Sequence, residues 1–172
     1  MALLSIRNLT TMFYTEERII KACDRVNLNI PAGKTVGLIG ETGCGKSVLG
    51  MSILRLLPRN AVINGEIRYK GEEILTMDAG RLRRLRGREI ALLPQSPSTS
   101  LNPVLKIGFQ IAEGLLLHRK IKWEEAWAKA VEMLEFLKLP EPAKRAQEYP
   151  HQLSSGMKQR ALAAAGITGR PG

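Results

Sequence analysis

Alternating apolar and polar residues dominate the first thirty positions of the chain. Apolar and polar side chains alternate through residues 5–9 and 19–30, most regularly at Val26, Leu28 and Ile30, and such alternation predicts half-buried β-strands. A Pro-Ala-Gly-Lys turn at 31–34 leads into the apolar run 35–39, where we predict a further strand. A hairpin-like element is expected over 64–74 and a short buried strand over 89–93.

Beyond Pro97 the apolar positions follow a helical period. Two series of apolar residues at three- and four-residue intervals predict two amphipathic helices, and Glu125 supports the second because it lies four residues before Lys129. We interpret Trp123 and Trp127 as packing residues of this second helix. The two series are Val104, Ile107, Ile111, Leu115 and Trp127, Ala130, Val131, Leu134, Leu137.

These patterns predict an α/β protein with two parts. The first is a nucleotide-binding core over residues 1–96, and the second is a helical subdomain over residues 97–168. At 172 residues the chain is long enough for one substantial core and at most two small subdomains.

A glycine-rich run, the phosphate loop, joins the predicted strand 35–39 to a predicted helix. Glycines let successive backbone N–H groups turn toward an anion, and a helix N-terminus adds partial positive charge. A lysine in this position reaches the β- and γ-phosphates of a nucleotide, and the following serine can hold Mg²⁺. The loop consists of Gly40, Glu41, Thr42, Gly43, Cys44, Gly45, Lys46 and Ser47.

Composition limits the classes of protein to which this chain could belong. Cys23 and Cys44 are too few to form a disulfide framework, and no stretch approaches 18 consecutive apolar residues. A net charge of +10 is typical of proteins that bind nucleic acid or an anionic membrane surface. The densest basic run, 81–88, contains no aromatic residue for stacking on bases, so we interpret it as a solvated helix face.

Three motifs in fixed order resemble the ATP-binding subunits of ABC transporters. They are the phosphate loop, Gln95 at the end of an apolar segment, and the signature-like run 153–160 that opens an alanine-rich helix. Within that family, residues 98–104 and 149–152 resemble the importer branch for oligopeptides, dipeptides and nickel. The resemblance implies a P-loop NTPase core of the ABC type with an antiparallel β subdomain and a helical insert.

The resemblance also implies roles for individual residues. Ser47 and Gln95 would contact Mg²⁺, with Gln95 also orienting water, and Tyr14 would stack on adenine, although Phe13 competes for that role. The signature residues would contact ATP held by a second subunit in a head-to-tail dimer. They are Ser154, Ser155, Gly156 and Met157, with Ser155 standing where the family usually has glycine.

Hydrolytic residues are not found in this chain. The family uses an apolar strand ending in aspartate, then a glutamate and a histidine, and no four apolar residues here precede Asp or Glu. His118 and His151 have no partners at ligand or triad spacing. We therefore expect no catalytic residue, background ATP turnover by these 172 residues, and a chain truncated after residue 172 relative to an intact subunit.

In its intact form, the protein is expected to be the ATPase of a peptide or nickel importer. ATP and Mg²⁺ would be its cofactors, and transmembrane permease subunits its partners at the cytoplasmic face of the cell membrane, with no nucleic acid. The alternatives are a soluble ABC-type ATPase acting on nucleic acid or ribosomes, a P-loop small-molecule kinase, and an inactive nucleotide-binding fragment.

Overall fold

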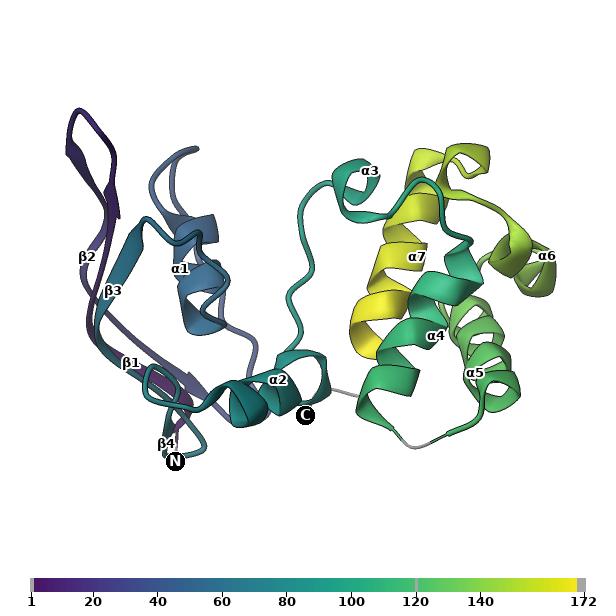
Figure 1. Ribbon diagram of the computed structural model, residues 1–172, viewed down its shortest axis with the longest axis horizontal. Helices are drawn as coiled ribbons and strands as arrows, with labels where there is room; N and C mark the ends of the chain where they lie inside the picture. The colour runs from purple at the N-terminus through teal and green to yellow at the C-terminus, as the bar shows by residue number, and fades with distance from the viewer. Residues whose placement is uncertain (1, 120, 170–172) are drawn as a thin grey trace. The chain divides into compact units, whose positions relative to one another are not determined.

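A computed structural model describes residues 2–119 and 121–169 of the chain (Figure 1). Its contacts divide the chain into two compact units, Met1–Leu82 and Arg83–Gly172. The division into a nucleotide-binding core and a helical subdomain at residue 97 remains a prediction. The strands and helices are β1 (Ala2–Tyr14), β2 (Ile19–Pro31), α1 (Lys46–Ile53), β3 (Ala61–Tyr69), β4 (Glu72–Glu73), α2 (Ala79–Arg88), α3 (Pro97–Ser100), α4 (Ile107–His118), α5 (Trp123–Phe136), α6 (Pro142–Gln147), the 3₁₀ helix η1 (Pro150–Gln152) and α7 (Ser155–Ile167).

The first unit is built on an antiparallel sheet with strand order β2-β1-β3-β4. Ile6 in β1 pairs with Leu28 in β2 and with Ile67 in β3. Leu4 and Ile6 are buried because alternate strand residues share one face of the sheet, and Ile67 is buried beside Ile6. Leu9 is also buried although it is three residues after Ile6, because the strand is irregular between them, with a positive φ of 48° at Asn8. The predicted strands at 5–9 and 19–30 and the hairpin over 64–74 therefore fall within β1, β2 and the β3–β4 pair.

Two predicted strands are not formed. Residues 35–39 and 91–93 have no strand assignment, and residue 90 makes only an isolated bridge to Arg86. A strand needs a neighbour for its backbone N–H and C=O groups, and among the described residues neither segment pairs with the sheet. Their apolar side chains are exposed, most of all Ile39, at 96%. The predictions of strands at 35–39 and 89–93 were therefore wrong.

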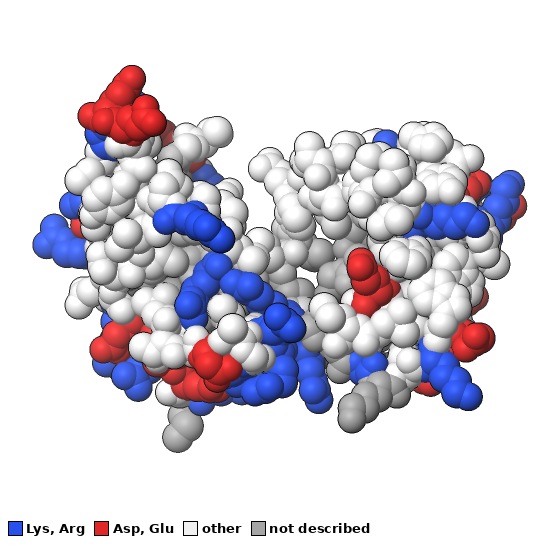
Figure 2. Space-filling view, viewed as in Figure 1, with Lys and Arg blue, Asp and Glu red and all other residues white. Residues whose placement is uncertain are grey.

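The basic run 81–88 lies on α2. Asp78 caps this helix by accepting hydrogen bonds from the backbone N–H groups of Gly80 and Arg81, at 2.8 and 2.9 Å. Leu82 and Leu85 are buried, whereas the arginines at 83, 84 and 88 are exposed. Figure 2 shows Lys and Arg side chains gathered over α2. Arg86 and Gly87 have non-helical backbone angles, so only the first part of the run is regular helix. The interpretation of this run as a solvated helix face remains a prediction.

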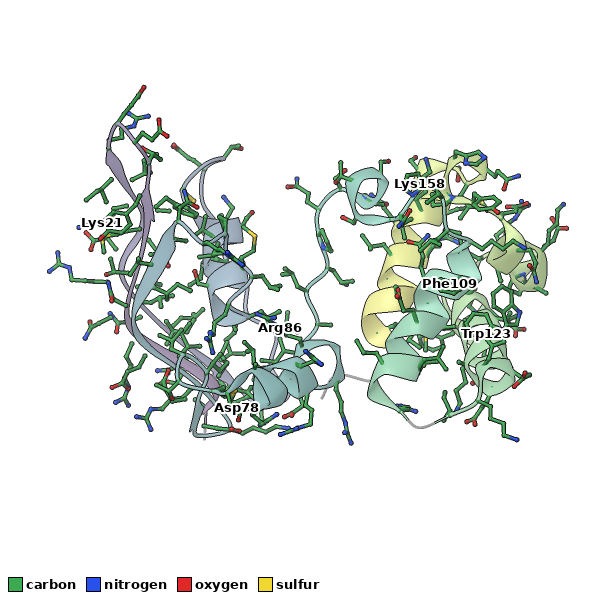
Figure 3. The ribbon with its side chains drawn as sticks, in the orientation of Figure 1. Lys21, Asp78, Arg86, Phe109, Trp123 and Lys158 are labelled. Carbon is green, nitrogen blue, oxygen red and sulfur yellow. The ribbon has the colours of Figure 1, made fainter. Side chains whose placement is uncertain are left out.

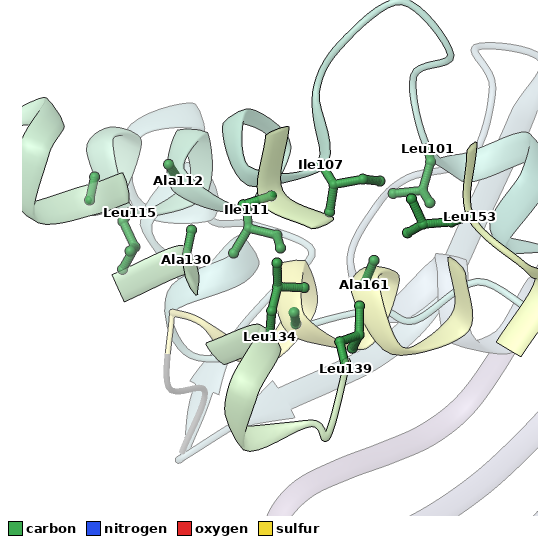
Figure 4. Close-up of a cluster of buried hydrophobic side chains, with 13 residues drawn as sticks. Leu101, Ile107, Ile111, Ala112, Leu115, Ala130, Leu134, Leu139, Leu153 and Ala161 are labelled. Carbon is green, nitrogen blue, oxygen red and sulfur yellow. The ribbon is translucent and has the colours of Figure 1, made fainter. Parts of the chain in front are cut away.

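The second unit is a group of helices around one hydrophobic cluster (Figure 4). Helix α4 packs against α5, α6 and α7, and α3 also contacts α7. The predicted helical series supply the centre of the cluster: Ile107, Ile111 and Leu115 from α4, and Ala130 and Leu134 from α5. Burial of each Leu or Ile side chain stabilises the folded unit by about 1.5–3 kcal/mol relative to leaving that side chain exposed. Both predicted helices are present, but Val104, the first residue of the first series, lies in the loop before α4 and is exposed. Its inclusion in the buried helical series was wrong, because the chain enters the helix only at Ile107.

Candidate nucleotide-binding site

The phosphate loop lies between the segment 35–39 and α1, and its lysine folds back over it. The Lys46 ammonium donates hydrogen bonds to the carbonyl oxygens of Gly40 at 2.7 Å and Glu41 at 2.6 Å, and lies 3.4 Å from the Cys44 sulfur. These partners are neutral, and no carboxylate within the described residues forms an ion pair with Lys46. The positive charge at the centre of the loop is therefore available to an anion.

Gly45 allows the loop to pass close to the sheet. Its φ of 95° lies in the left-handed region that disfavours other residues. A Cβ at this position would also lie 2.3 Å from the carbonyl oxygen of Ala22 in β2. Glycine is required here for both reasons, and it fixes the loop against β2 at the start of α1.

The first turn of α1 presents unbonded backbone donors. Leu49 makes the first hydrogen bond of the helix, its N–H donating to the Gly45 carbonyl at 2.9 Å. The N–H groups of Gly45, Lys46 and Ser47 donate to no acceptor within the described residues. Together with the partial positive charge of a helix N-terminus, these donors make a site for a phosphate group.

A buried hydroxyl pair fixes α1 to the sheet. Thr11 of β1 and Ser52 of α1 are fully buried, with their hydroxyl oxygens 3.0 Å apart. Cys23 of β2 pairs with Thr11 across the sheet, and its sulfur lies 3.8 Å from the Gly45 carbonyl. Burial raises the pKa of the Cys23 thiol, and a hydrogen bond with Thr11 partly offsets this rise. The sheet thus supports the phosphate loop from below with neutral groups.

The two candidates for adenine stacking lie at the end of β1. Successive strand residues face opposite sides of a sheet, and Thr11 faces α1 through its bond with Ser52. Phe13 therefore shares the α1 face with Thr11, whereas Tyr14 is directed to the other face and is exposed. The sequence predicts that Phe13 and Tyr14 face opposite sides of the sheet. It does not predict which side is covered by α1.

The remaining predicted site residues lie in the second unit. Gln95 is exposed in an irregular segment just before α3. Ser154 is the N-cap of α7, and its hydroxyl accepts a hydrogen bond from the Met157 N–H at 3.4 Å. Ser155 and Gly156 are exposed in the first turn, and Lys158 follows on the same helix (Figure 3). In the local structure, Ser154 therefore acts as the N-cap of α7.

An aromatic groove in the second unit was not predicted from the sequence. It has a volume of about 460 Å³. Phe109 and Trp123 both lie in this unit (Figure 3), with ring centroids 5.5 Å apart. The ring centroids of Trp123 and Trp127 are 5.7 Å apart. The lining residues are Val104, Leu105, Lys106, Phe109, Trp123, Trp127, Gln147 and Tyr149.

The helices that carry the groove residues are tightly packed at Gly108, the neighbour of Phe109. A Cβ on Gly108 would lie 2.7 Å from the Trp127 ring and 2.9 Å from Ala146, so only glycine lets α5 and α6 approach α4 this closely. Lys106 is held by a 3.0 Å hydrogen bond from its ammonium to Gln147. Helical spacing alone made Trp123 and Trp127 resemble core residues, but Trp123 is partly exposed at the groove.

Comparison with known protein families shows to which family the chain belongs. The family model described as ABC transporter matches residues 23–171. The chain belongs to the ABC transporter family. The resemblance predicted from the phosphate loop, Gln95 and the signature is thereby confirmed.

Curated ABC relatives carry names from peptide transport. The oligopeptide transport ATP-binding protein OppD of Escherichia coli (strain K12) is 38% identical over 170 residues, which cover 99% of this chain and 50% of OppD. A Brucella abortus (strain 2308) relative, named as a peptide import ATP-binding protein, is 46% identical over 98% of this chain and 51% of its own length. The chain spans about half the length of these curated relatives.

Solved ABC structures support the fold. A dimeric ATP-binding cassette in a post-hydrolysis state, bound to ADP and Pi, has a TM-score of 0.84 and 27% identity, covering 98% of this chain and 70% of that structure. The predicted ABC-type α/β fold with an antiparallel sheet and a helical part is confirmed. Among the described residues, no helix is long and apolar enough to span a bilayer, and no three His, Cys, Asp or Glu side chains gather as a metal site.

Proposed function

We propose that the intact protein is the ATP-binding subunit that energises an ABC importer, with peptides as the transported substrate. The observation that carries this proposal is the Lys46 ammonium, held by two neutral carbonyls at the N-terminus of α1 without a carboxylate partner in the described residues. The peptide-transport names of the relatives support the choice of substrate. Nickel is the other substrate class predicted for this branch.

Magnesium would be held by oxygen ligands from this chain. Ser47 is exposed in the first turn of α1, and Gln95 is exposed in its segment. Neither side-chain oxygen has a partner among the described residues. Hydroxyl and amide oxygens are hard donors that suit Mg²⁺, which neutralises phosphate charge when bound. Both residues thus fit the role, and Gln95 can orient water but cannot act as a general base.

Adenine stacking is assigned to Phe13 in preference to Tyr14. Phe13 shares the α1 face of the sheet with Thr11, and the phosphate loop leads directly into α1. An aromatic ring on that face can pack against a base whose phosphates lie on the loop.

The signature is assigned to ATP held by a second subunit, head to tail. A Cβ at Gly156 would meet no atom within 4 Å. The packing of this chain therefore gives no reason for glycine in the first turn of α7, where it weakens the helix. Close approach of a partner-bound phosphate supplies such a reason. The hydroxyl of Ser155, in place of the usual glycine, stands at the same exposed turn.

The aromatic groove is assigned to a cytoplasmic segment of a permease subunit. Its lining is aromatic and aliphatic with one cation, Lys106, and no acidic residue. A short amphipathic helix with a large apolar side chain and an acidic residue complements that chemistry. In this account ATP closes two subunits, hydrolysis reopens them, and the groove transmits the movement to the permease at the cytoplasmic membrane face.

Transport by the intact subunit tests the proposed function. Full-length protein reconstituted with its permease subunits in lipid vesicles should take up labelled peptide only with ATP and Mg²⁺, and Lys46→Ala should abolish uptake. ATP turnover that continues in Lys46→Ala, or peptide uptake that does not need ATP, would contradict the proposal.

A second pair of variants tests the docking groove. Trp123→Glu should uncouple ATP turnover from uptake and leave nucleotide affinity unchanged, because it places a charge among aromatic rings. Phe136→Glu is the matched control, since Phe136 is an exposed aromatic residue of α5 that does not line the groove. Equal coupling in both variants would exclude the groove as the docking site.

A nucleic-acid role is retained as the second candidate because of three arginines on α2. Arg83, Arg84 and Arg88 are exposed and form no ion pair within the described part of the chain. If neutralising all three abolished a salt-dependent affinity for RNA or DNA, while Trp123→Glu had no effect on transport, this second function would replace the first.

A further inference from the structure

The side chain of Gln110 in α4 holds the loop before that helix with three hydrogen bonds. Its Oε1 accepts from the Asn102 N–H at 2.8 Å. Its Nε2 donates to the carbonyls of Asn102 at 3.0 Å and Leu105 at 2.9 Å. A glutamine amide has two donors and two acceptor positions, so both donors and one acceptor position serve this loop.

The loop 102–105 depends on this side chain because it forms no regular structure. Buried groups anchor it at both ends, with Leu101 in the hydrophobic cluster before it and Ile107 after it. Between them, Asn102 Oδ1 accepts from the Val104 N–H at 3.1 Å. The Leu105 N–H also donates to the Asn102 carbonyl at 3.3 Å, which closes a local turn. The side-chain amides of Gln110 and Asn102 add four hydrogen bonds to this turn, and together they fix one loop conformation.

This loop forms one wall of the aromatic groove. Val104, Leu105 and Lys106 line the groove together with Phe109, whereas Gln110 does not. Val104 is 74% exposed although it is apolar. The hydrogen bonds of Gln110 to Asn102 and Leu105 hold the backbone on both sides of this exposed side chain.

We propose that Gln110 is a positioning residue that holds Val104 and Leu105 as a preformed wall for the permease segment. A preformed wall binds more tightly because no loop needs to be ordered on docking. The proposal rests on the proposed function, because it takes the permease segment as the occupant of the groove.

The three hydrogen bonds of Gln110, called the Gln110 clamp here, distinguish a positioning role of this side chain from a role in packing alone. A packing role would tolerate leucine at this position, because its size is similar and part of the Gln110 side chain is buried. A clamp would not, because leucine offers neither donor nor acceptor. Gln110→Glu would also fail, because carboxylate oxygens would face the carbonyls of Asn102 and Leu105 in place of N–H donors.

The experiment uses the full-length subunit and its permease in lipid nanodiscs. Gln110→Leu and Gln110→Glu should each weaken permease binding about tenfold, with ATP affinity unchanged. In Gln110→Leu, which offers no acceptor to the Asn102 N–H, hydrogen exchange at that amide should also become about tenfold faster or more. Glu132→Leu, an exposed α5 variant, is the control and should change neither quantity.

The outcomes separate this proposal from the proposed function. If the parent subunit does not bind the permease, the proposed function is wrong, and the role of Gln110 is wrong with it. If the parent binds and both Gln110 variants bind equally well, only the role of Gln110 is wrong. If one variant does not fold, the other decides. Unchanged exchange at Asn102 in a folded Gln110→Leu variant would also overturn the proposal.

Discussion

Thr11 and Ser52 join the sheet to α1 through two fully buried hydroxyl oxygens 3.0 Å apart. The Ser52 hydroxyl also donates to the Val48 carbonyl at 2.7 Å. Since a hydroxyl has one proton, Thr11 is then the donor to Ser52. This chain of bonds runs from the sheet to the first turn of the helix that follows the phosphate loop. These bonds hold α1, and with it the end of the phosphate loop, against the sheet.

Replacement of Ser52 should therefore destabilise the first unit. Ser52→Ala leaves the Thr11 hydroxyl without this acceptor in a buried position, and we expect a loss of about 1–3 kcal/mol in the free energy of unfolding. Urea unfolding followed by circular dichroism measures it. Adding Thr11→Val to Ser52→Ala should cost less than the sum of the two single changes, because the two hydroxyls act as one unit. Strict additivity would show that they are not coupled.

The two cysteines should differ in thiol reactivity. Cys44 is exposed in the phosphate loop, whereas Cys23 is buried. Burial raises the pKa of the Cys23 thiol, so less of the reactive thiolate exists at any pH below that pKa. N-ethylmaleimide at pH 7 should label Cys44 alone, and ATP should slow the labelling because the phosphates cover the loop. Mass spectrometry of the digested chain locates the label. ATP-independent labelling of Cys44 would count against a nucleotide on this loop.

The choice between Phe13 and Tyr14 can be tested with two ligands. Phe13→Ala should weaken ATP binding by about 0.5–1.5 kcal/mol beyond the area effect, because it removes a stacking surface. Its affinity for inorganic triphosphate, which has no base, should not change. Tyr14→Ala is the matched variant and should have the smaller effect on ATP. If Tyr14→Ala has the larger effect instead, the original prediction of Tyr14 is correct.

Local patterns in the sequence predicted most of the elements. Buried side chains recur with the period of a strand in β1 and β2, and with the period of a helix at Ile107, Ile111 and Leu115. These periods can be recognised in the sequence. All glycines and the lysine of the phosphate loop lie within eight consecutive residues, so phosphate binding could be predicted from that segment alone. Such features can be read from sequence because neighbouring residues determine them.

Features that depend on distant residues could not be predicted. The apolar run 35–39 has the composition of a buried strand, but a strand forms only beside another one. Trp123 and Trp127 have the spacing of core residues, and only the packing of α4 against α5 shows that Trp123 borders a groove. The clamp by Gln110 likewise depends on how the loop 102–105 folds back onto α4.

The affinity of the chain for ATP, compared between the parent and Lys46→Ala, tests the central claim most directly. Isothermal titration should show binding weaker by about 1.5–3 kcal/mol in Lys46→Ala, because the variant lacks a charge-assisted contact to phosphate. Lys34→Ala, which removes an exposed lysine from the turn after β2, is the control and should bind as the parent does. Equal affinity of the parent and a folded Lys46→Ala variant would contradict the assignment of residues 40–47 as a nucleotide-binding loop.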